Sequence, residues 1–335
     1  MPKVHQDSSK YDSYAQVTAF AAVREEMDRV KTCIDAHVRN DMQIADLEPL
    51  LEHVTARTGK MIRPGLVLLA GKACNGVQPD HIKGSAVMEM LHFATLLHDD
   101  VIDHSLQRRA QPTANAMWGN ETAILLGDYL LTVVFNLCTE LPTECARVVA
   151  RTTSLVCRGE LRQTLACADW DITVSQYLEI ISDKSASFLE GCCRLGAMLA
   201  GGTPAEVEAL ARYGLHVGIA FQIADDLLDI WGDKVQIGKS TGSDIHKNKA
   251  TLPVIRLLEL SDTQEQDDLI TSLESPTFDL TSLQACLLER GCLDYAREIL
   301  DQHIDRAITA LAGLDESDTG RAFIELAHFL GHREV

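Results

Sequence analysis

Two aspartate clusters with identical spacing constrain this chain more than any other feature of its sequence. Residues 99–103 read DDVID and residues 225–229 read DDLLD, so both follow the pattern DDxxD. Each cluster lies in an apolar segment with helical periodicity, which places its first and last aspartates about one turn apart on one helix face. Like charges so placed cost a bare helix roughly 0.2–0.5 kcal/mol per pair. We therefore expect divalent cations, bound through the carboxylate oxygens, to offset this repulsion.

The composition predicts an all-α protein. The chain has 335 residues, of which 46% are hydrophobic and only 5% aromatic, and its long segments rich in Ala, Leu, Glu and Arg favour helix over sheet. Helices are expected at about residues 14–38, 47–57, 64–74, 80–103, 123–138, 143–166, 174–199 and 204–231, followed by three or four more that end near residue 332.

The organisation predicted is a single domain over residues 1–335, with a polar and flexible leader at residues 1–13. No linker rich in Pro, Gly or Ser separates the two aspartate clusters, although they lie more than a hundred residues apart. One helical bundle that brings the clusters face to face explains this economically.

Charge and cysteine content limit the partners and the compartment. The formal net charge of -19 argues against nucleic acid or an anionic membrane surface as a partner. The ten cysteines form no CxxC pair and are expected to be reduced thiols in a cytoplasmic protein. No uninterrupted apolar run reaches the ~18 residues of a spanning helix, so no stable membrane insertion is expected.

Basic residues near the first cluster suit a phosphorylated substrate, which the global negative charge would otherwise repel. Arg108 and Arg109 follow the cluster, and the planar guanidinium matches phosphate oxygens, although simple ion pairs with the aspartates remain an alternative. Lys60 and Arg63 lie three residues apart at an expected helix start, where backbone N–H groups also favour an anion.

Two further features have both a structural and a functional interpretation. His92 lies seven residues before Asp99, about two turns along the same helix face, and is either a hydrogen-bonded core residue or part of the site. Lys239 and Lys249 bracket a polar loop at residues 232–249, which is either an ordinary surface loop or a cationic flap over a diphosphate.

These residues together resemble the trans-polyprenyl diphosphate synthases over nearly the whole chain. The matching segments are GKxxRP at 59–64, His92 with LLHDDVID at 96–103, the arginine pair at 108–109, KSA at 184–186, FQxxDDxxD at 221–229, GK at 238–239 and KATLP at 249–253. The departures, Ala110, Ser185 and Asn248, remove no charged group. Asn tolerates a left-handed backbone where the family usually has glycine.

The resemblance implies the isoprenoid synthase fold, a helical bundle around a central cavity, and a homodimer. It implies isopentenyl diphosphate and an allylic diphosphate as substrates and Mg²⁺ as cofactor. The ion would be held by Asp99, Asp103 and Asp225, with Asp100, Asp226 and Asp229 in the inner or the next coordination layer. The allylic diphosphate would be bound by Arg108, Lys184, Lys239 and Lys249 beside Gln222, and isopentenyl diphosphate by Lys60, Arg63, His92 and Arg109. Asp99, Asp103, Asp225 and Lys184 are the expected catalytic residues.

The expected reaction is ionisation of the allylic diphosphate, attack by the isopentenyl double bond and loss of a proton. In related enzymes a bulky aromatic residue five positions before the first aspartate blocks chain growth. Here that position is Ala94, followed by Thr95, so the resemblance implies a product longer than farnesyl, geranylgeranyl or longer. A helical wheel places Thr95 and Leu91 nearer to the Asp99 stripe than Ala94.

Two alternatives to a condensing synthase stay open. A terpene cyclase shares an aspartate-rich first motif and the helical class, although Lys60, Arg63 and the second full DDxxD favour the condensation of two substrates. A catalytically silent partner subunit of a heteromeric synthase is expected to have lost metal carboxylates, whereas all six are present.

Overall fold

The computed structural model describes residues 17–40, 47–55, 59–108, 111–232, 241–275, 277–314 and 317–332. Nearly all of this part of the chain is helical, which confirms the predicted all-α class. The strands described are β1 (Gln107–Arg108) and β2 (Gln111–Pro112), an antiparallel pair just after the first aspartate cluster. The predicted leader at residues 1–13 and the predicted ligands Arg109 and Lys239 lie outside the described residues.

The elements follow one another as helices joined by short turns. A 3₁₀ turn, η3 (Thr18–Val23), precedes α1, and a π-helical turn, η5 (Ser182–Ala186), joins α8 to α9 without a break. The α-helices in chain order are α1 (Arg24–Asn40), α2 (Glu48–Thr55), α3 (Ile62–Ala73), α4 (Pro79–Ile102), α5 (Ala114–Trp118), α6 (Asn120–Cys138), α7 (Thr143–Leu165), α8 (Val174–Ile181), α9 (Ser187–Leu199), α10 (Pro204–Trp231), α12 (Ser243–His246), α13 (Leu252–Leu260), α14 (Thr263–Leu273), α15 (Leu280–Glu289), α16 (Cys292–Ala310) and α17 (Asp318–Gly331).

The helices expected between residues 17 and 231 are present, with ends that differ by only a few residues. The prediction of three or four helices after the polar loop at residues 232–249 is wrong, because the described residues there form α13 to α17, and the short helix α12 lies within the predicted loop. Polar N-caps interrupt this region: Asp262 begins α14 and Asp279 begins α15, each accepting a backbone hydrogen bond of the first turn. The short helices between such caps are too brief to give a clear apolar period.

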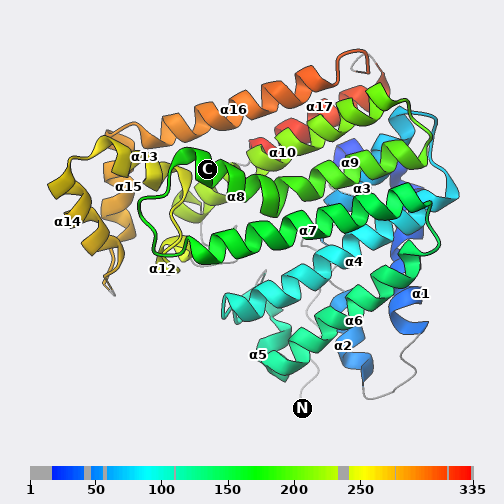
Figure 1. Cartoon of the computed structure of the whole chain (residues 1–335), viewed down its shortest axis with the longest axis horizontal. Coiled ribbons are helices and arrows are strands. Elements are labelled where there is room, and N and C mark those ends of the chain that lie inside the picture. The colour runs from blue at the N-terminus through cyan, green and yellow to red at the C-terminus, as the bar shows by residue number, and fades with distance from the viewer. Residues whose placement is uncertain are drawn as a thin grey trace.

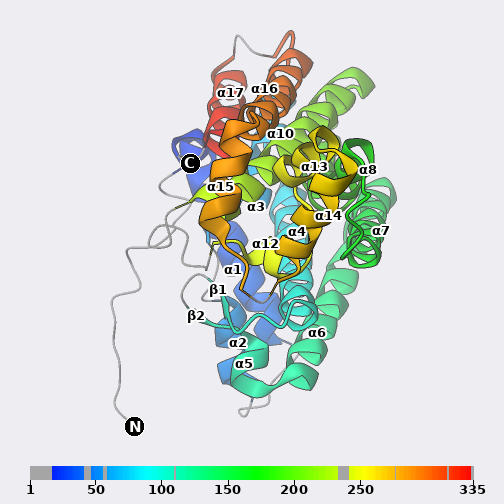
Figure 2. The same cartoon turned by 90° about the vertical axis from the view of Figure 1, so that its left-hand side faces the viewer.

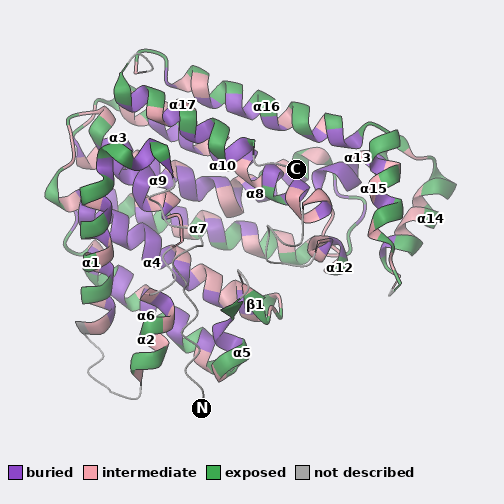
Figure 3. Ribbon diagram, turned by 180° about the vertical axis from the view of Figure 1, so that it is seen from behind, coloured by how far each residue is buried: buried purple, intermediate pink, exposed green. Residues whose placement is uncertain are grey.

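The long helices α4, α6, α7, α9, α10 and α16 run along the long axis of the molecule (Figure 1). Helix α9 packs against α3 on one side and α10 on the other, while α4 packs between α3 and α6. In the burial view, α9 and α10 are largely buried, whereas α14 and α15 at one end are largely exposed (Figure 3). Seen from that end, α12 to α15 lie in front of the long helices, above the β1–β2 pair that follows α4 (Figure 2).

The core has one large and one small part. The large apolar cluster joins η3 and α1 through α4, α6, α9 and α10 to α16 and α17, with Tyr213, Phe20 and Phe323 among its largest fully buried side chains. The smaller cluster lies around α13 and α15 and includes Trp170 and Ile230. All ten cysteines are free thiols, and Cys157 on α7 is exposed.

Helix α6 is the one described helix that is long and apolar enough to cross a membrane by length and composition. A core helix can pass the same test, and one side of α6 does pack against α4. Its other side exposes Leu125 and Phe135. The predicted absence of membrane insertion stays a prediction.

Candidate active site

The first aspartate cluster forms the last turn of α4, and its carboxylates divide between the site and the protein interior. The backbone N–H of Asp103 donates to the carbonyl of Asp99 at 2.8 Å, which sets these two residues one turn apart as predicted. The Asp103 carboxylate accepts from Lys247 Nζ at 2.8 Å and from Lys249 Nζ at 3.2 Å. Asp100 is buried and is held by Arg108 through Nε at 3.0 Å and Nη2 at 2.9 Å.

The pKa values of Asp99 and Asp103, the first and last aspartates of this cluster, are shifted in opposite directions. Burial raises the pKa of Asp99 to about 6, and the nearby Glu160 carboxylate adds to this effect, while Lys184 and Arg108 oppose it. Burial would also raise the pKa of Asp103, but Lys247 and Lys249 outweigh it and hold that pKa below its ordinary value. Asp99 therefore carries a negative charge that the protein itself compensates poorly.

The second cluster lies in the last two turns of α10. Asp225 lies on the exposed side of the helix and Asp226 is buried. The Asp226 carboxylate accepts from Tyr177 Oη at 2.6 Å and from Gln222 Nε2 at 2.8 Å. Burial and the neighbouring Asp244 raise the pKa of Asp226 to about 8 despite these donors. Asp226 thus contacts the protein interior rather than solvent.

Asp229, the last aspartate of the second cluster, organises the segment that follows. Its carboxylate accepts from the backbone N–H groups of Ser243 at 3.2 Å and Asp244 at 3.0 Å, at the start of α12. Lys247 and Lys249 follow directly after α12, and both pair with Asp103 of the first cluster. The segment around α12 therefore connects the two aspartate clusters.

The π-helical turn η5 lies beside both clusters and presents Lys184. Lys184 Nζ lies 2.5 Å from Glu160 Oε2 and donates to Gln163 Oε1 at 2.6 Å; Glu160 and Gln163 both belong to α7. On the next residue, Ser185 Oγ donates to Gln222 Oε1 at 2.6 Å, on α10. A π turn rotates the following helix relative to a regular α-helix, and such turns are frequent at functional sites.

Two glycines let neighbouring helices approach this turn. A Cβ atom at Gly159 on α7 would lie 2.3 Å from the Lys184 backbone nitrogen, and one at Gly218 on α10 would lie 2.5 Å from the Ala186 Cα atom. Contacts this short exclude any larger residue without backbone movement. The close packing fixes the position of Lys184 between α7 and α10.

The other predicted cations gather around aromatic rings. The Arg63 guanidinium carbon lies 4.7 Å from the centroid of the Phe188 ring, and the His92 ring meets the same ring edge-on at 5.9 Å. Lys60 Nζ lies 5.2 Å from the centroid of Phe329 on α17. Phe188 follows Lys184 by one turn of a continuous helix, so the ring that contacts Arg63 and His92 lies one turn away from Lys184.

Several residues of this region were missed by sequence reasoning. Glu160 and Gln163 contact Lys184, Lys247 contacts Asp103, and Tyr177 contacts Asp226. The separation of Glu160 and Gln163 by three residues on an expected helix is a usable signal, because it places both on one face. No local pattern distinguishes Tyr177 from other core tyrosines.

A cavity of about 270 Å³ opens beside this arrangement. Its lining includes Asp103, Glu160, Gln163, Lys247 and Lys249, so charged groups from α4, α7 and the segment after α12 face a common space. The predicted chain-length positions lie further back along α4. Leu91 and Ala94 are buried, whereas Thr95 is half-buried and donates from Oγ1 to the His92 carbonyl at 2.8 Å.

The donor set suits a hard divalent cation held jointly with a ligand. Within the described ranges, no three His, Cys, Asp or Glu side chains already converge on one ion position. Mg²⁺ is usually bound by one or two carboxylates together with substrate phosphates, so a complete protein cage is not required. Asp99 and Asp103 from α4 and Asp225 from α10 offer the oxygens, and the raised pKa of Asp99 marks a charge that a cation would stabilise.

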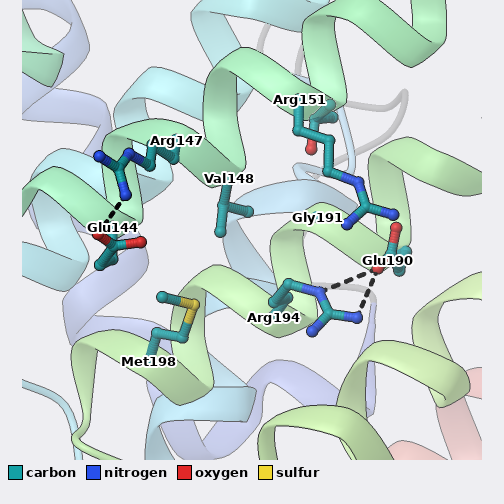
Figure 4. Close-up of a pocket in the computed structure, with 9 residues that line it drawn as sticks. Glu144, Arg147, Val148, Arg151, Glu190, Gly191, Arg194 and Met198 are labelled. Atoms are coloured by element: carbon teal, nitrogen blue, oxygen red, sulfur yellow. Dashed lines mark hydrogen bonds and ion pairs between the residues drawn. The ribbon is translucent and has the colours of Figure 1, made fainter.

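A second pocket, of about 190 Å³, lies away from these residues between α7 and α9 (Figure 4). Two of its arginines already pair with glutamates: Arg147 lies 2.6 Å from Glu144 and Arg194 lies 2.8 Å from Glu190. None of the predicted site residues that the structure describes lines this pocket.

Known proteins with similar sequences and structures act in one area of chemistry. The polyprenyl synthetase family model matches residues 45–288. Octaprenyl diphosphate synthase of Escherichia coli is 33% identical over 92% of this chain and 96% of its own length, and geranylgeranyl diphosphate synthase of Mycobacterium tuberculosis is 37% identical over 76% and 75%. A polyprenyl synthase structure from Caulobacter crescentus, complexed with calcium and isoprenyl diphosphate, has a TM-score of 0.88 at 32% identity and covers 97% of this chain and 99% of its own.

These relatives confirm the isoprenyl diphosphate synthase fold that the resemblance implied. They include synthases of quite different product lengths, so they do not assign one to this chain. The calcium in the related structure accords with the divalent metal that the family uses. The chain therefore belongs to the polyprenyl synthetase family and is a trans-polyprenyl diphosphate synthase, a metal-using prenyltransferase of isoprenoid biosynthesis.

Proposed function

We propose that this enzyme uses Mg²⁺ to condense isopentenyl diphosphate with an allylic diphosphate and releases a product longer than farnesyl diphosphate. The observation that carries the proposal is the position of Lys184. Its positive charge lies near enough to Asp99 of the first cluster to favour the ionised carboxylate, and its neighbour Ser185 donates a hydrogen bond to Gln222 beside the second cluster. The turn η5 therefore lies where carboxylates that could bind metal ions are close to basic side chains that could bind a diphosphate.

The allylic diphosphate would be held between the two clusters. Asp99, Asp103 and Asp225 are the proposed ligands of Mg²⁺, which when bound neutralises charge on the leaving diphosphate. Lys184 and Lys249 now pair with Glu160 and Asp103 and would donate to the diphosphate once it is bound. These cations stabilise negative charge where it develops as the carbon–oxygen bond breaks.

The remaining aspartates have positioning roles in this proposal. Asp100 holds Arg108 toward the site, and Asp226 fixes Gln222 beside Ser185. Asp229 anchors α12 and thereby the lysines that follow it. Arg109 and Lys239, outside the described residues, are proposed to contact the isopentenyl and the allylic diphosphate respectively.

Isopentenyl diphosphate would lie at Lys60, Arg63 and His92, the residues that contact Phe188 and Phe329. Its double bond would attack the allylic carbocation, and the released diphosphate would accept the proton lost from the adduct. No side chain forms a covalent bond in this scheme. The apolar walls of the site would keep water from the cation, because burial both excludes water and strengthens the charge interactions.

A single assay tests this function against its alternatives. Purified enzyme is incubated with Mg²⁺ and dimethylallyl, geranyl or farnesyl diphosphate, with and without labelled isopentenyl diphosphate. A condensing synthase forms product only when isopentenyl diphosphate is present. Consumption of the allylic substrate alone would indicate a terpene cyclase, and turnover restored only by a second protein would indicate a partner subunit. Lys184→Gln should greatly reduce kcat, whereas Lys31→Gln on α1, outside the proposed site, should not.

The product length is proposed from the small side chain at position 94. Ala94 is 1% exposed, so a larger residue there must project into the space along α4 that the growing chain would use. Ala94→Phe is expected to shorten the product, and mass spectrometry of the labelled products measures this. Ala94→Ser changes the volume little and serves as the control. An unchanged product length in Ala94→Phe would reject this assignment for Ala94. Thr95 and Leu91 are tested in the same way, and an unchanged product length in their enlarged variants would reject the assignment for them.

We further propose that residues 1–335 form one domain, that the enzyme is cytoplasmic and that it is a homodimer.

The proposed homodimer would form through α6 and α7. These helices lie on the same side of the molecule in both views (Figures 1 and 2). They expose Leu125 and Phe135 on α6 and Leu161 and Leu165 on α7, with Leu165 83% exposed. A second copy covering this face would bury them. Light scattering should give twice the monomer mass, and Leu165→Glu should reduce it; a wild-type monomer would refute the proposal.

A further inference from the structure

Three of the four residues assigned to isopentenyl diphosphate, Lys60, Arg63 and His92, share a feature that their sequence pattern does not show: each packs against an aromatic ring. Phe188 of α9 contacts both Arg63 and His92, at 4.7 Å and 5.9 Å between the group centres. Phe329 of α17 lies 5.2 Å from Lys60 Nζ. The two rings come from helices far from these residues in the sequence, α9 and α17.

The geometry of these contacts leaves the cations able to bind phosphate. A ring attracts a cation through its π face and offers no hydrogen-bond acceptor of carboxylate strength. A guanidinium packed by its own face keeps its N–H donors at the edge, where they match phosphate oxygens. On the allylic side, Lys184 and Lys249 donate to the carboxylates of Glu160 and Asp103.

The two rings differ in how much they contribute to packing. Phe188 is 2% exposed and belongs to the large core cluster, so it both fills space and faces Arg63. Phe329 is 39% exposed, near the end of the described chain. The buried part of this ring contributes to packing, but less than a fully buried ring does. The cation contact with Lys60 gives a physical reason for a ring at this position.

We propose that Phe188 and Phe329 are positioning residues that hold Arg63, His92 and Lys60 in place for the diphosphate of isopentenyl diphosphate. This inference rests on the proposed function, because it deepens the description of the same site. It assigns α17 a direct part in the isopentenyl subsite. Because Phe188 lies one turn after Lys184, it also connects the two diphosphate subsites through one continuous helix.

Truncation of each ring should raise KM for isopentenyl diphosphate and leave KM for the allylic substrate and kcat nearly unchanged. Phe329→Leu, at a partly exposed contact, is expected to raise it about two- to fivefold, and Phe188→Leu, at a buried contact, up to about thirtyfold. Phe329→Trp should restore the wild-type KM, because indole binds cations best. Phe323→Leu is the matched control: its ring lies on the same helix but packs against Tyr213 at 4.8 Å.

A graded series separates the cation contact from packing. Mono-, di- and trifluorinated phenylalanines incorporated at position 329 keep the ring shape while progressively weakening its negative face. KM for isopentenyl diphosphate should rise stepwise along the series, and the same series at position 323 should be flat. A flat series at 329, or an equal rise in KM for both substrates, would overturn the proposal. Absence of any condensation in the wild-type enzyme would instead reject the proposed function.

Discussion

Replacement of Asp99 by asparagine should make the ligand-free enzyme more stable while it abolishes synthesis. Asp99 is held at a site where burial and Glu160 disfavour its charge, and its pKa is raised from 3.8 to about 6. A difference of about two pH units between the unfolded and folded states corresponds to about 3 kcal/mol. Asparagine has nearly the same shape and carries no charge, so the variant avoids this cost.

The sign of the effect gives it a distinctive pH dependence. Below about pH 4 the carboxyl is protonated in both states, and the variant and wild type should be equally stable. Between about pH 4 and 6 the folded wild type binds a proton that the unfolded chain releases, so its free energy of unfolding falls as the pH rises. Above about pH 6 the full difference of about 3 kcal/mol should be present.

Urea denaturation in the presence of a chelator, at pH values from 4 to 8, measures this difference directly. The exposed Asp267→Asn is the control for loss of one charge and should show no comparable trend. Addition of Mg²⁺ with inorganic pyrophosphate should stabilise the wild type far more than the variant, because a ligand stabilises the state that binds it. A constant difference across the pH range would show that burial of the Asp99 charge is not the cause.

Three other predictions concern the support of the site and the fold. Tyr177→Phe removes the donor to buried Asp226 and should lower the free energy of unfolding by about 1–3 kcal/mol; an unchanged urea midpoint would contradict the hydrogen bond. Gly196→Ala places a methyl 2.1 Å from the Val67 carbonyl, and thermal unfolding should report a loss of about 1–3 kcal/mol, with full stability as the refuting result. Burial lowers the pKa of His303 to about 4, so between about pH 4 and 6.5 the unfolded chain binds a proton that the folded chain does not, and the wild type loses stability on acidification. His303→Gln should remove up to about 3 kcal/mol of that loss, as measured by urea denaturation at both ends of this pH range.

The sequence by itself determined the helical class, most of the long helices and the family. These features depend on local properties: the apolar period of a helix, its capping residues and the spacing of charged side chains within one turn. The DDxxD spacing likewise required Asp99 and Asp103 to lie on one face, as the structure has them. It also anticipated a left-handed residue at Asn248, whose φ is 53°. The helices from α13 onward were miscounted because few residues lie between the caps of the short ones.

Only the tertiary structure decided which side chains face the site and what surrounds them. Helical geometry turns neighbouring residues by about 100°, but only packing selects the face that is buried, so Asp100 and Asp226 became internal partners of Arg108 and Tyr177. Glu160 and Phe329 reach their lysines from helices distant in sequence. Their roles depend on how α7 and α17 pack against the bundle, and those contacts exist only after the chain has folded.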